Sequence, residues 1–277
     1  MAVERAADQA AELTRFLEAV AGRYGYDLRG YAPTSLRRRV VATLRQSGIP
    51  SLPELERRIL SDPVLFARVL DSLTVRVSEM FRDPTFYRAF RARVVPLLHA
   101  KTHINVWHAG CSTGEEVYST AIVLAEEGLL DRCQIYATDL SPRAIEDARL
   151  GVYAADGLAR FAGHYRAAGG ALDLARYATE AYGRVSFHES LRGKIHFFQH
   201  DLVGDHVFAE MDVIFCRNVM IYFGRALKER VLTKLGDGMR PGGFLCLGRS
   251  EHLAGAGRLR FTDFAPSERI FRAGAPS

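Results

Sequence analysis

The pattern of apolar and polar positions changes character along the chain. From residue 104 onward, short apolar runs alternate with longer segments of helical periodicity. This alternation is typical of a parallel, doubly wound α/β sheet. The predicted strands are residues 104–109, 134–138, 195–198, 213–216 and 244–248, and the predicted helices are residues 114–127, 142–150 and 225–239. We also expect a turn at 240–243 and an antiparallel strand pair at 261–264 and 269–272.

Residues 1–72 have a different pattern, without the alternating β-branched residues of strands, and are predicted to form a small all-α domain. Within it, Ser51 and Glu54 have the spacing of a capping box, and Asp62 precedes Pro63 as the start of another helix. Residues 73–98 are predicted to be a linker with a connecting helix that begins at Asp83-Pro84. Residues 99–277 then form the α/β domain.

One block interrupts the alternation of strands and helices in the α/β domain. Residues 152–193 are too long for a plain connection between a strand and a helix, and they are rich in Tyr, Arg, Gly and Ala. We expect this block to be either an inserted subdomain or a mobile lid.

The composition is that of a globular protein, with 48% hydrophobic and 25% charged residues. The chain has no apolar run of about 18 residues, and charges occupy the N-terminal positions where a signal peptide needs an apolar stretch. We therefore expect a cytoplasmic protein without direct membrane insertion. The four cysteines lack the spacing of a zinc site or a disulfide framework, so no metal is expected. Nothing indicates an obligate interface, and we expect a monomer.

Part of the net charge of +5 is concentrated in one stretch of the chain. Residues 29–45 contain several arginines and no acidic residue, and Arg37, Arg38, Arg39 and Arg45 lie in one predicted helix. Such a positive surface is either a solvated helix face or a docking site for an acidic protein or for nucleic acid phosphates.

A glycine-containing loop follows the first strand of the α/β region. Gly110 allows the backbone to pass close to a ligand at the carboxyl edge of the sheet, where open α/β folds bind nucleotides. Glu115 and Glu116 would repel phosphates from the helix that follows. Asp139 ends the second strand, where an acid can accept ribose hydroxyls, and Ser141 serves as the helix cap and leaves Asp139 free. Together these features favour S-adenosylmethionine over a dinucleotide or a nucleoside triphosphate.

A second group of polar residues follows the strand that ends at Cys216. Arg217, Asn218 and Tyr222 are expected at the same edge of the sheet. Many amine methyltransferases have an Asn/Asp-Pro-Pro-Tyr run here that orients a nitrogen lone pair, and this run is missing. A carboxylate is already ionised at neutral pH and would need no general base, so it is a compatible methyl acceptor.

Several stretches carry a resemblance to a known family. They are Gly30-Tyr31 with the run from Ser35 to Arg39, the linker from Ser78 to Pro84, the loop from Cys111 to Glu116, the triplet 137–139 and the run from Phe215 to Phe223. With these stretches the chain resembles the CheR family, the S-adenosylmethionine-dependent chemoreceptor glutamate methyltransferases of bacterial chemotaxis. The resemblance covers nearly the whole chain, and the linker and the last run are its most specific parts.

The resemblance implies a fold, an activity and a partner. The fold is a Rossmann-like class I S-adenosylmethionine-dependent methyltransferase domain with a small inserted subdomain, preceded by the all-α domain. The activity is transfer of the methyl group of S-adenosyl-L-methionine to glutamates of methyl-accepting chemoreceptor cytoplasmic domains, for adaptation in chemotaxis-type signalling. The products are a glutamate methyl ester and S-adenosyl-L-homocysteine, and neither a metal nor a nucleic acid takes part.

The resemblance also implies roles for individual residues. Arg82 and Tyr222 are expected to be catalytic, with Arg82 near the methionine end of the cofactor and the incoming carboxylate. Glu116 is expected by the amino group of the cofactor and Asp139 at its ribose. The remaining cofactor-binding residues are Ser78, Gly110, Asp201 and Leu202 (which flank the adenine), Arg217 and Asn218, and the receptor-docking residues are Arg37, Arg38, Arg39 and Arg45.

Two departures from the family pattern leave alternatives open. Arg76 stands where the family usually has Asn and could alter cofactor contacts, whereas Ser78 replaces Thr and keeps the hydroxyl. The block 152–193, which in some members binds a receptor C-terminal pentapeptide, has no clear glycine-bounded tight loop. The alternatives are a cofactor-binding sensor or adaptor without transfer activity, and a methyltransferase with a non-receptor substrate such as a nucleic acid. The Arg stretch lacks interleaved aromatic residues, which counts against nucleic acid.

Overall fold

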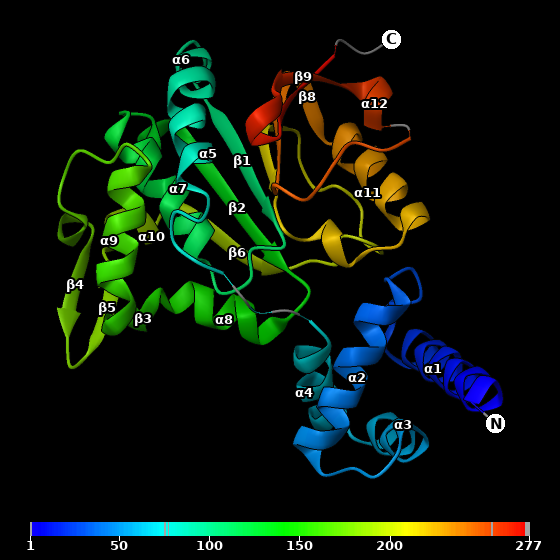
Figure 1. Cartoon of the computed structure of the whole chain (residues 1–277). Helices are drawn as coiled ribbons and strands as arrows, with labels where there is room; N and C mark the ends of the chain where they lie inside the picture. Colours follow the sequence, from blue (N-terminus) through cyan, green and yellow to red (C-terminus); the bar gives the residue numbers. More distant parts are fainter. Residues whose placement is uncertain (1, 75, 77, 256, 275–277) are drawn as a thin grey trace.

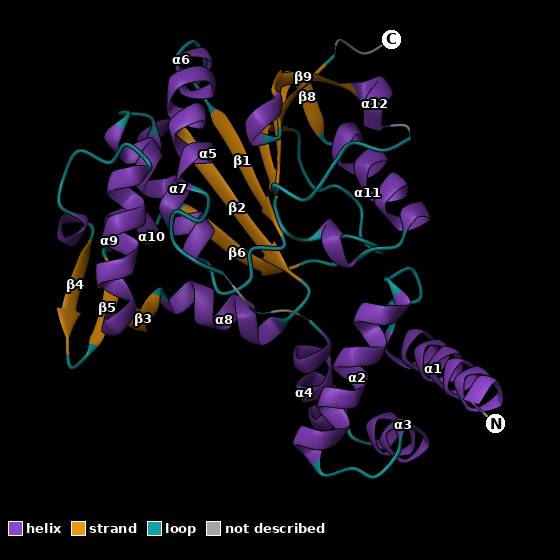
Figure 2. Cartoon of the chain, viewed as in Figure 1, coloured by secondary structure: helices purple, strands orange, loops and turns teal. Residues whose placement is uncertain are grey.

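The structure, a computed structural model, describes residues 2–74, 76, 78–255 and 257–274. Its centre is a seven-stranded sheet with the strand order β6-β2-β1-β7-β8-β10-β9 (Figures 1 and 2). The strands β6, β2, β1, β7 and β8 are parallel, and β10 is antiparallel to β8 and β9. The strands are β1 (Ile104–Ala109), β2 (Cys133–Asp139), β6 (Ile195–Gln199), β7 (Met211–Cys216), β8 (Met239–Leu247), β9 (Phe261–Ala265) and β10 (Ile270–Ala273). The parallel sheet with an antiparallel pair near its edge confirms the prediction.

Helices cover both faces of this sheet, so the α/β class is also confirmed. Alternate side chains of β1 divide the core, because Val106 packs with one group of helices and Trp107 with the other. The first face carries α5 (Pro84–Ala89), the π-helical turn η1 (Phe90–Val94), α6 (Val95–Leu98), α7 (Glu115–Glu126) and α8 (Pro142–Leu150). The second face carries α11 (Arg225–Asp237), followed by the short α12 (Gly257–Arg260) near the C-terminal strands.

The predicted turn at residues 240–243 is wrong in its placement. Helix α11 already ends at Asp237, and residues 240–243 lie within β8 as an irregularity of the strand. Met239 pairs with Met211 and Phe244 pairs with Val213, so β8 contains extra residues between two paired positions. This is a bulge, and Gly242 adopts the positive φ of 74° within it.

The N-terminal helices are α1 (Ala2–Tyr24), α2 (Pro33–Ser47), α3 (Leu52–Ser61) and α4 (Pro63–Leu73). They enclose a core of their own, in which Phe16, Leu55 and Val69 are buried. The two predicted caps are confirmed: Ser51 Oγ accepts a hydrogen bond from the amide of Glu54, and Asp62 Oδ1 accepts one from the amide of Val64.

The segment that follows α8 forms a small antiparallel sheet with the order β3-β5-β4. Its elements are β3 (Val152–Ala154), α9 (Leu158–Ala167), β4 (Ala178–Ala181), β5 (Arg184–Phe187) and α10 (Glu189–Arg192). Tyr182 and Gly183 join β4 to β5 in a two-residue turn with φ values of 52° and 69°. Two positive φ values are typical of a type I′ hairpin. A tight loop with a glycine therefore exists here, contrary to the sequence interpretation, which missed it because Tyr replaces the usual Asn or Asp.

The N-terminal helices lie beside the carboxyl edge of the main sheet (Figure 1). The segment before α2 pairs with the segment after β7, because the amide of Ala32 donates to the carbonyl of Tyr222 and the amide of Gly224 donates to the carbonyl of Gly30, each at 2.8 Å. The rings of Tyr31 and Phe223 pack edge to face with their centroids 4.9 Å apart. This junction closes one side of the site described next.

Candidate functional site

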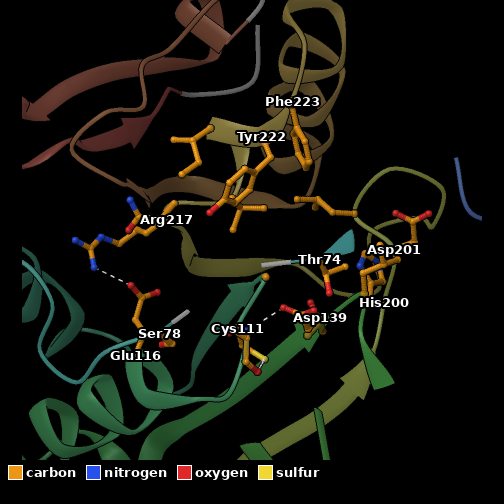
Figure 3. Close-up of a pocket in the computed structure, with 18 of the residues that line it drawn as sticks. Thr74, Ser78, Cys111, Glu116, Asp139, His200, Asp201, Arg217, Tyr222 and Phe223 are labelled. Carbon is orange, nitrogen blue, oxygen red and sulfur yellow. Dashed lines mark hydrogen bonds and ion pairs between the residues drawn. The ribbon is translucent and has the colours of Figure 1, made fainter. Parts of the chain in front are cut away.

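A cavity of about 290 Å³ lies at the carboxyl edge of the sheet, and Figure 3 shows side chains that line it. Residues of the loops after β1, β2, β6 and β7 line it, together with Tyr31, Arg39 and Thr74 from the N-terminal part of the chain. All the residues predicted to be catalytic or to bind the cofactor line this one cavity: Ser78, Arg82, Gly110, Glu116, Asp139, Asp201, Leu202, Arg217, Asn218 and Tyr222. The structure thus brings the predicted group together, and the individual roles stay predictions.

The loop after β1 needs glycine at its first position. Gly110 has a φ of 83°, and a Cβ atom at this position would lie 2.5 Å from Cγ2 of Val219 in the loop after β7. The two loops can therefore approach each other only with glycine here. Ser112, two residues later, also has a positive φ and donates its amide to Asp139 at 2.8 Å. The backbone of the glycine loop is thus bonded to the carboxylate that ends β2.

Asp139 is more engaged than the sequence indicated. Its Oδ2 accepts the amide of Ser112 and its Oδ1 accepts the amide of Ser141 at 3.0 Å, while Ser141 Oγ caps helix α8 as predicted. Each carboxylate oxygen of Asp139 therefore has one lone pair left for a ligand, so the prediction that Asp139 is free is only partly correct. Burial raises the pKa of this carboxyl, although its amide donors oppose the shift.

Arg217 is the centre of a buried ion network at the other end of the cavity. Its Nη1 donates to Glu116 at 2.7 Å and its Nη2 donates to Asp83 at 2.9 Å, and the guanidinium lies 4.0 Å from the centre of the Phe86 ring. Burial opposes ionisation of Glu116, but Arg217 and His108 outweigh it and lower the pKa of that carboxyl. Asp83 occupies the predicted cap position of α5, yet its side chain forms this ion pair instead of capping the helix.

The loop that carries Asn218 is bound by a buried glutamate that was not predicted from the sequence. Glu251 is buried and accepts the amides of Asn218, Val219 and Gly248 at distances from 2.6 to 3.0 Å. These bonds support Asn218 in a left-handed conformation with a φ of 61°. Burial raises the pKa of Glu251. The only sequence signal was an acid shortly after Gly248 at the end of a predicted strand.

The linker residues differ in where their side chains go. Arg82 and Ser78 line the cavity, whereas Arg76 is absent from the lining residues and its Nη1 lies 3.5 Å from Asp147 of helix α8. The expected influence of Arg76 on the cofactor is therefore not supported by a position in the cavity. Within the described residues, no carboxylate lies within ion-pair distance of Arg82.

The far end of the cavity is formed by the residues after β6. Asp201 Oδ1 accepts the amide of Val203 at 2.8 Å, and burial raises the pKa of Asp201. Leu202 is buried and lines the cavity beside His200, which was not predicted. His200 Nε2 donates a hydrogen bond to the carbonyl of His206, 3.0 Å away, so this loop is folded back on itself.

The predicted docking residues separate into two groups. Arg37, Arg38 and Arg45 are exposed and line a shallow groove along α2. Arg39 is 7% exposed, lines the cavity and lies over the ring of Tyr222, so its assignment to the docking surface is wrong. The physical reason is the helical period: Leu36, Val40 and Thr43 face the N-terminal core, and Arg39 lies on the same side.

The cavity fits a positively charged nucleoside better than a phosphate. The lining residues that the structure describes include no lysine, and their four acids outnumber their three arginines: Glu79, Glu116, Asp139 and Asp201 against Arg39, Arg82 and Arg217. The cradle at Gly110 and the unused lone pairs of Asp139 suit a ribose and the chain attached to it. These residues fit S-adenosylmethionine, with Asp139 as the residue that would hold the ribose.

Comparisons with known proteins agree with this geometry. Residues 76–266 match the family model "CheR methyltransferase, SAM binding domain", and residues 11–74 match "CheR methyltransferase, all-alpha domain". The chain is 44% identical over 262 residues to "Putative methyltransferase Cher3" of Pseudomonas putida, which covers 94% of this chain and 96% of that protein. It is 31% identical to "Chemotaxis protein methyltransferase Cher2" of the same organism over 76% of this chain and 79% of that one. A chemotaxis protein methyltransferase of Vibrio parahaemolyticus is also 31% identical, over 88% of this chain and 89% of that protein.

The helices themselves add one further observation. Among the described residues, no helix is long and apolar enough to cross a membrane.

The two family matches together span most of the chain, and they coincide with the helical region and the α/β region that enclose the cavity. The chain therefore belongs to the CheR methyltransferase family and is an S-adenosylmethionine-dependent methyltransferase.

Proposed function

We propose that this protein methylates the side-chain carboxylates of glutamates in the cytoplasmic domains of methyl-accepting chemoreceptors. S-adenosyl-L-methionine supplies the methyl group when bound, and the products are a glutamate methyl ester and S-adenosyl-L-homocysteine. The proposal rests mainly on one observation: Arg82 lines the cavity without a carboxylate partner among the described residues, whereas Arg217 is neutralised by Glu116 and Asp83. An incoming carboxylate is the natural partner of such a guanidinium.

Arg82 and Tyr222 lie on the cavity wall where they can orient that carboxylate. The guanidinium of Arg82 would donate charge-assisted hydrogen bonds, and the hydroxyl of Tyr222 would donate another. The carboxylate needs no general base, because it is ionised at neutral pH. Positioning of this kind can contribute roughly 7–11 kcal/mol to catalysis at best. Exclusion of water by the junction at Tyr31 and Phe223 would keep the acceptor reactive.

The exposed face of α2 supports an acidic helical partner. Arg37, Arg38 and Arg45 lie along one groove, which complements the acidic, glutamate-bearing helices of chemoreceptors. Charge reversal to Glu at Arg38 and Arg45 should raise the KM for a receptor fragment by about tenfold or more and should weaken the salt dependence of binding. An unchanged KM in the double variant would contradict the docking role.

The catalytic role of Arg82 is tested by methyl transfer to a receptor cytoplasmic fragment. Arg82→Ala should lower kcat by about 100-fold, since it removes the donors aimed at the reacting carboxylate. The control is Arg88→Ala, an exposed arginine of α5, which should stay within about twofold of the wild type. Near-normal turnover of Arg82→Ala would remove Arg82 from the mechanism.

The main argument for a sensor or adaptor without transfer activity is weakened. It was based on Arg76, and this side chain contacts Asp147 on helix α8 and is not part of the cavity lining. The basic groove of α2 would also attract nucleic acid phosphates, but its described lining residues include no aromatic side chain on which a base could stack, so the receptor carboxylate is the function we retain.

A further inference from the structure

Arg39 contacts the predicted catalytic residue Tyr222 directly, although it comes from the helix whose other side is exposed and basic. Its guanidinium carbon lies 4.2 Å from the centre of the Tyr222 ring. This is within the range of a cation–π interaction, which is stronger when the pair is removed from water. Arg39 is 7% exposed and Tyr222 is half-buried, so the cation of the pair is largely removed from water.

The guanidinium of Arg39 is itself held in place from two sides. Its Nη1 donates to the carbonyl of Leu73 at the end of α4, at 2.5 Å, and its Nη2 donates to Ser35 Oγ at 3.2 Å. These bonds use the edge of the guanidinium and leave its face for the Tyr222 ring. The orientation of the guanidinium is therefore set by contacts within the helical domain.

The backbone of Tyr222 is fixed by the segment that leads into the same helix. Its carbonyl accepts the amide of Ala32, and two residues later Gly224 donates to Gly30, each at 2.8 Å. The chains approach closely here, because a Cβ atom at Gly224 would lie 3.0 Å from the carbonyl oxygen of Gly30. Residues 30–39 thus hold Tyr222 by its main chain and by its ring.

The other side of α2 faces solvent. Arg37 and Arg38 are exposed on that side, and Arg39 turns inward with Leu36 and Val40. A buried guanidinium that is already bonded to Leu73 and Ser35 is poorly placed to dock a partner on the surface. One helix therefore carries a docking surface on one side and a contact with the cavity on the other.

We infer that Arg39 is a positioning residue that holds the Tyr222 ring in place for methyl transfer, so that the helix that docks the receptor also completes the active site. This inference rests on the proposed function, because it takes Tyr222 to act on the receptor carboxylate. Arg39 acts through Tyr222 and need not touch the substrate.

The decisive experiment is a double-mutant cycle on receptor methylation with Arg39→Met and Tyr222→Leu. Arg39→Met should lower kcat by about tenfold, with the KM for the receptor fragment and the Kd for S-adenosylmethionine within about twofold of the wild type. In the Tyr222→Leu background, Arg39→Met should have almost no further effect, because its target is gone. Arg39→Lys, which keeps the cation, should restore part of the rate.

Other patterns would overturn the inference. Independent, multiplicative effects of the two substitutions would mean that Arg39 does not act through Tyr222. A raised KM alone would make Arg39 a docking residue, and a weakened cofactor Kd alone would make it a cofactor ligand. Arg38→Met serves as the matched comparison, since an exposed docking residue should change KM and not kcat. Equal unfolding temperatures of the variants exclude loss of fold as the cause.

A spectroscopic readout separates this inference from the proposed function. In protein labelled with 3-fluorotyrosine, the ¹⁹F signal of Tyr222 can be assigned from its loss in Tyr222→Phe. Arg39→Met should shift or broaden this signal, and Arg38→Met should leave it in place. If the wild type methylates no receptor but the signal still responds to Arg39→Met, the proposed function fails and the contact stands. If the wild type is active and the signal does not respond, the inference fails alone.

Discussion

Arg217 Nη1 lies 2.7 Å from Glu116 Oε2, which joins the residue that follows β7 to the first turn of the helix that follows β1. Asp83 binds the second terminal nitrogen of the same guanidinium, so one buried cation serves two carboxylates. His108 approaches the other oxygen of Glu116 at 3.3 Å. Two carboxylates therefore share one buried guanidinium beside the cavity.

The network predicts a large cost for removal of its cation. Arg217→Met would leave the largely buried side chains of Glu116 and Asp83 with only His108 and the exposed Arg249 nearby. We expect a loss of about 3 kcal/mol in the free energy of unfolding. Arg225→Met is the control, because Arg225 is 91% exposed and pairs loosely with Glu229 at 3.4 Å; its effect should stay within about 0.5 kcal/mol. Urea unfolding measures both, and equal losses would contradict the structural role of the network.

Gly110→Ala tests the close approach of the loops after β1 and β7. The substitution has two costs, a positive φ of 83° and an overlap of the new Cβ with Val219 at 2.5 Å. Gly128→Ala has only the first cost, since Gly128 has a φ of 66° and no atom within 4 Å of a Cβ. We expect Gly128→Ala to lower stability by about 1–2 kcal/mol. Gly110→Ala should lower stability more and should also weaken S-adenosylmethionine binding, as measured by calorimetry.

If both glycine variants bound the cofactor with wild-type affinity, the glycine loop would not form part of the cofactor site. A selective loss in Gly110→Ala is the result that the geometry predicts, because only this variant displaces the loop that carries Asn218 and Val219.

The raised pKa of Asp139 predicts that cofactor affinity depends on pH. Burial raises the pKa of this carboxyl, so it takes up a proton at a higher pH than an ordinary aspartate does and then loses acceptor capacity for the ribose. The affinity for S-adenosylmethionine should therefore fall as the pH falls through this raised pKa. Asp201 also has a raised pKa in the same cavity, so Asp139→Asn is needed to isolate the contribution of Asp139. The variant should bind more weakly at neutral pH and depend less on pH.

The contribution of Asp139 to the free energy of unfolding should change with pH in the opposite direction to its contribution to cofactor affinity. A carboxyl with a raised pKa in the folded state contributes stability that is fully present below its unfolded pKa and lost as the pH rises through the folded pKa. Glu116, with a lowered pKa, contributes stability that is lost only as the pH falls through that lower value. Mild acid should therefore weaken cofactor binding before it unfolds the protein. Simultaneous loss of both on acid titration would contradict this account.

Glu251→Gln tests the support beneath the Asn218 loop. A glutamine has one acceptor oxygen and one NH₂ group, so at least one of the three amides now bound by Glu251 would lose its acceptor. We expect a cost of about 1–3 kcal/mol and a lower rate of methyl transfer. The control Glu146→Gln changes the same charge at an exposed position of α8 and should have little effect. Equal transfer rates in the two variants would refute a supporting role for Glu251.

The main sheet could be predicted because the signals for its strands, and for the helices between them, lie in short stretches of the sequence. The apolar run 104–109 coincides with β1, and Ser141 caps α8 as its position before Pro142 predicted. The cavity residues were also predictable, because the carboxyl ends of parallel strands meet at one edge. Arg39 was assigned to the wrong side, although the spacing of Leu36, Val40 and Thr43 carried the signal for an inward position.

The partners of buried charges could not be predicted in the same way. Asp83 looked like a helix cap, but it pairs with Arg217, 134 positions away in the chain. Glu251 binds amides of a loop 32 and 33 positions earlier. Such pairs depend on how the loops pack in three dimensions, and no periodicity or local motif records them.

The most direct test of the account is the chemistry of the transferred methyl group. Wild-type protein, labelled S-adenosylmethionine and chemoreceptor cytoplasmic fragments from the same organism should yield label on the receptor that mild base releases as methanol. Carboxyl methyl esters hydrolyse under these conditions, and N-methyl groups do not. Asp139→Ala should abolish the label, and peptide mapping should place it on glutamates. Base-stable label, or cofactor binding without any transfer to the receptors, would contradict the proposed glutamate methyltransferase.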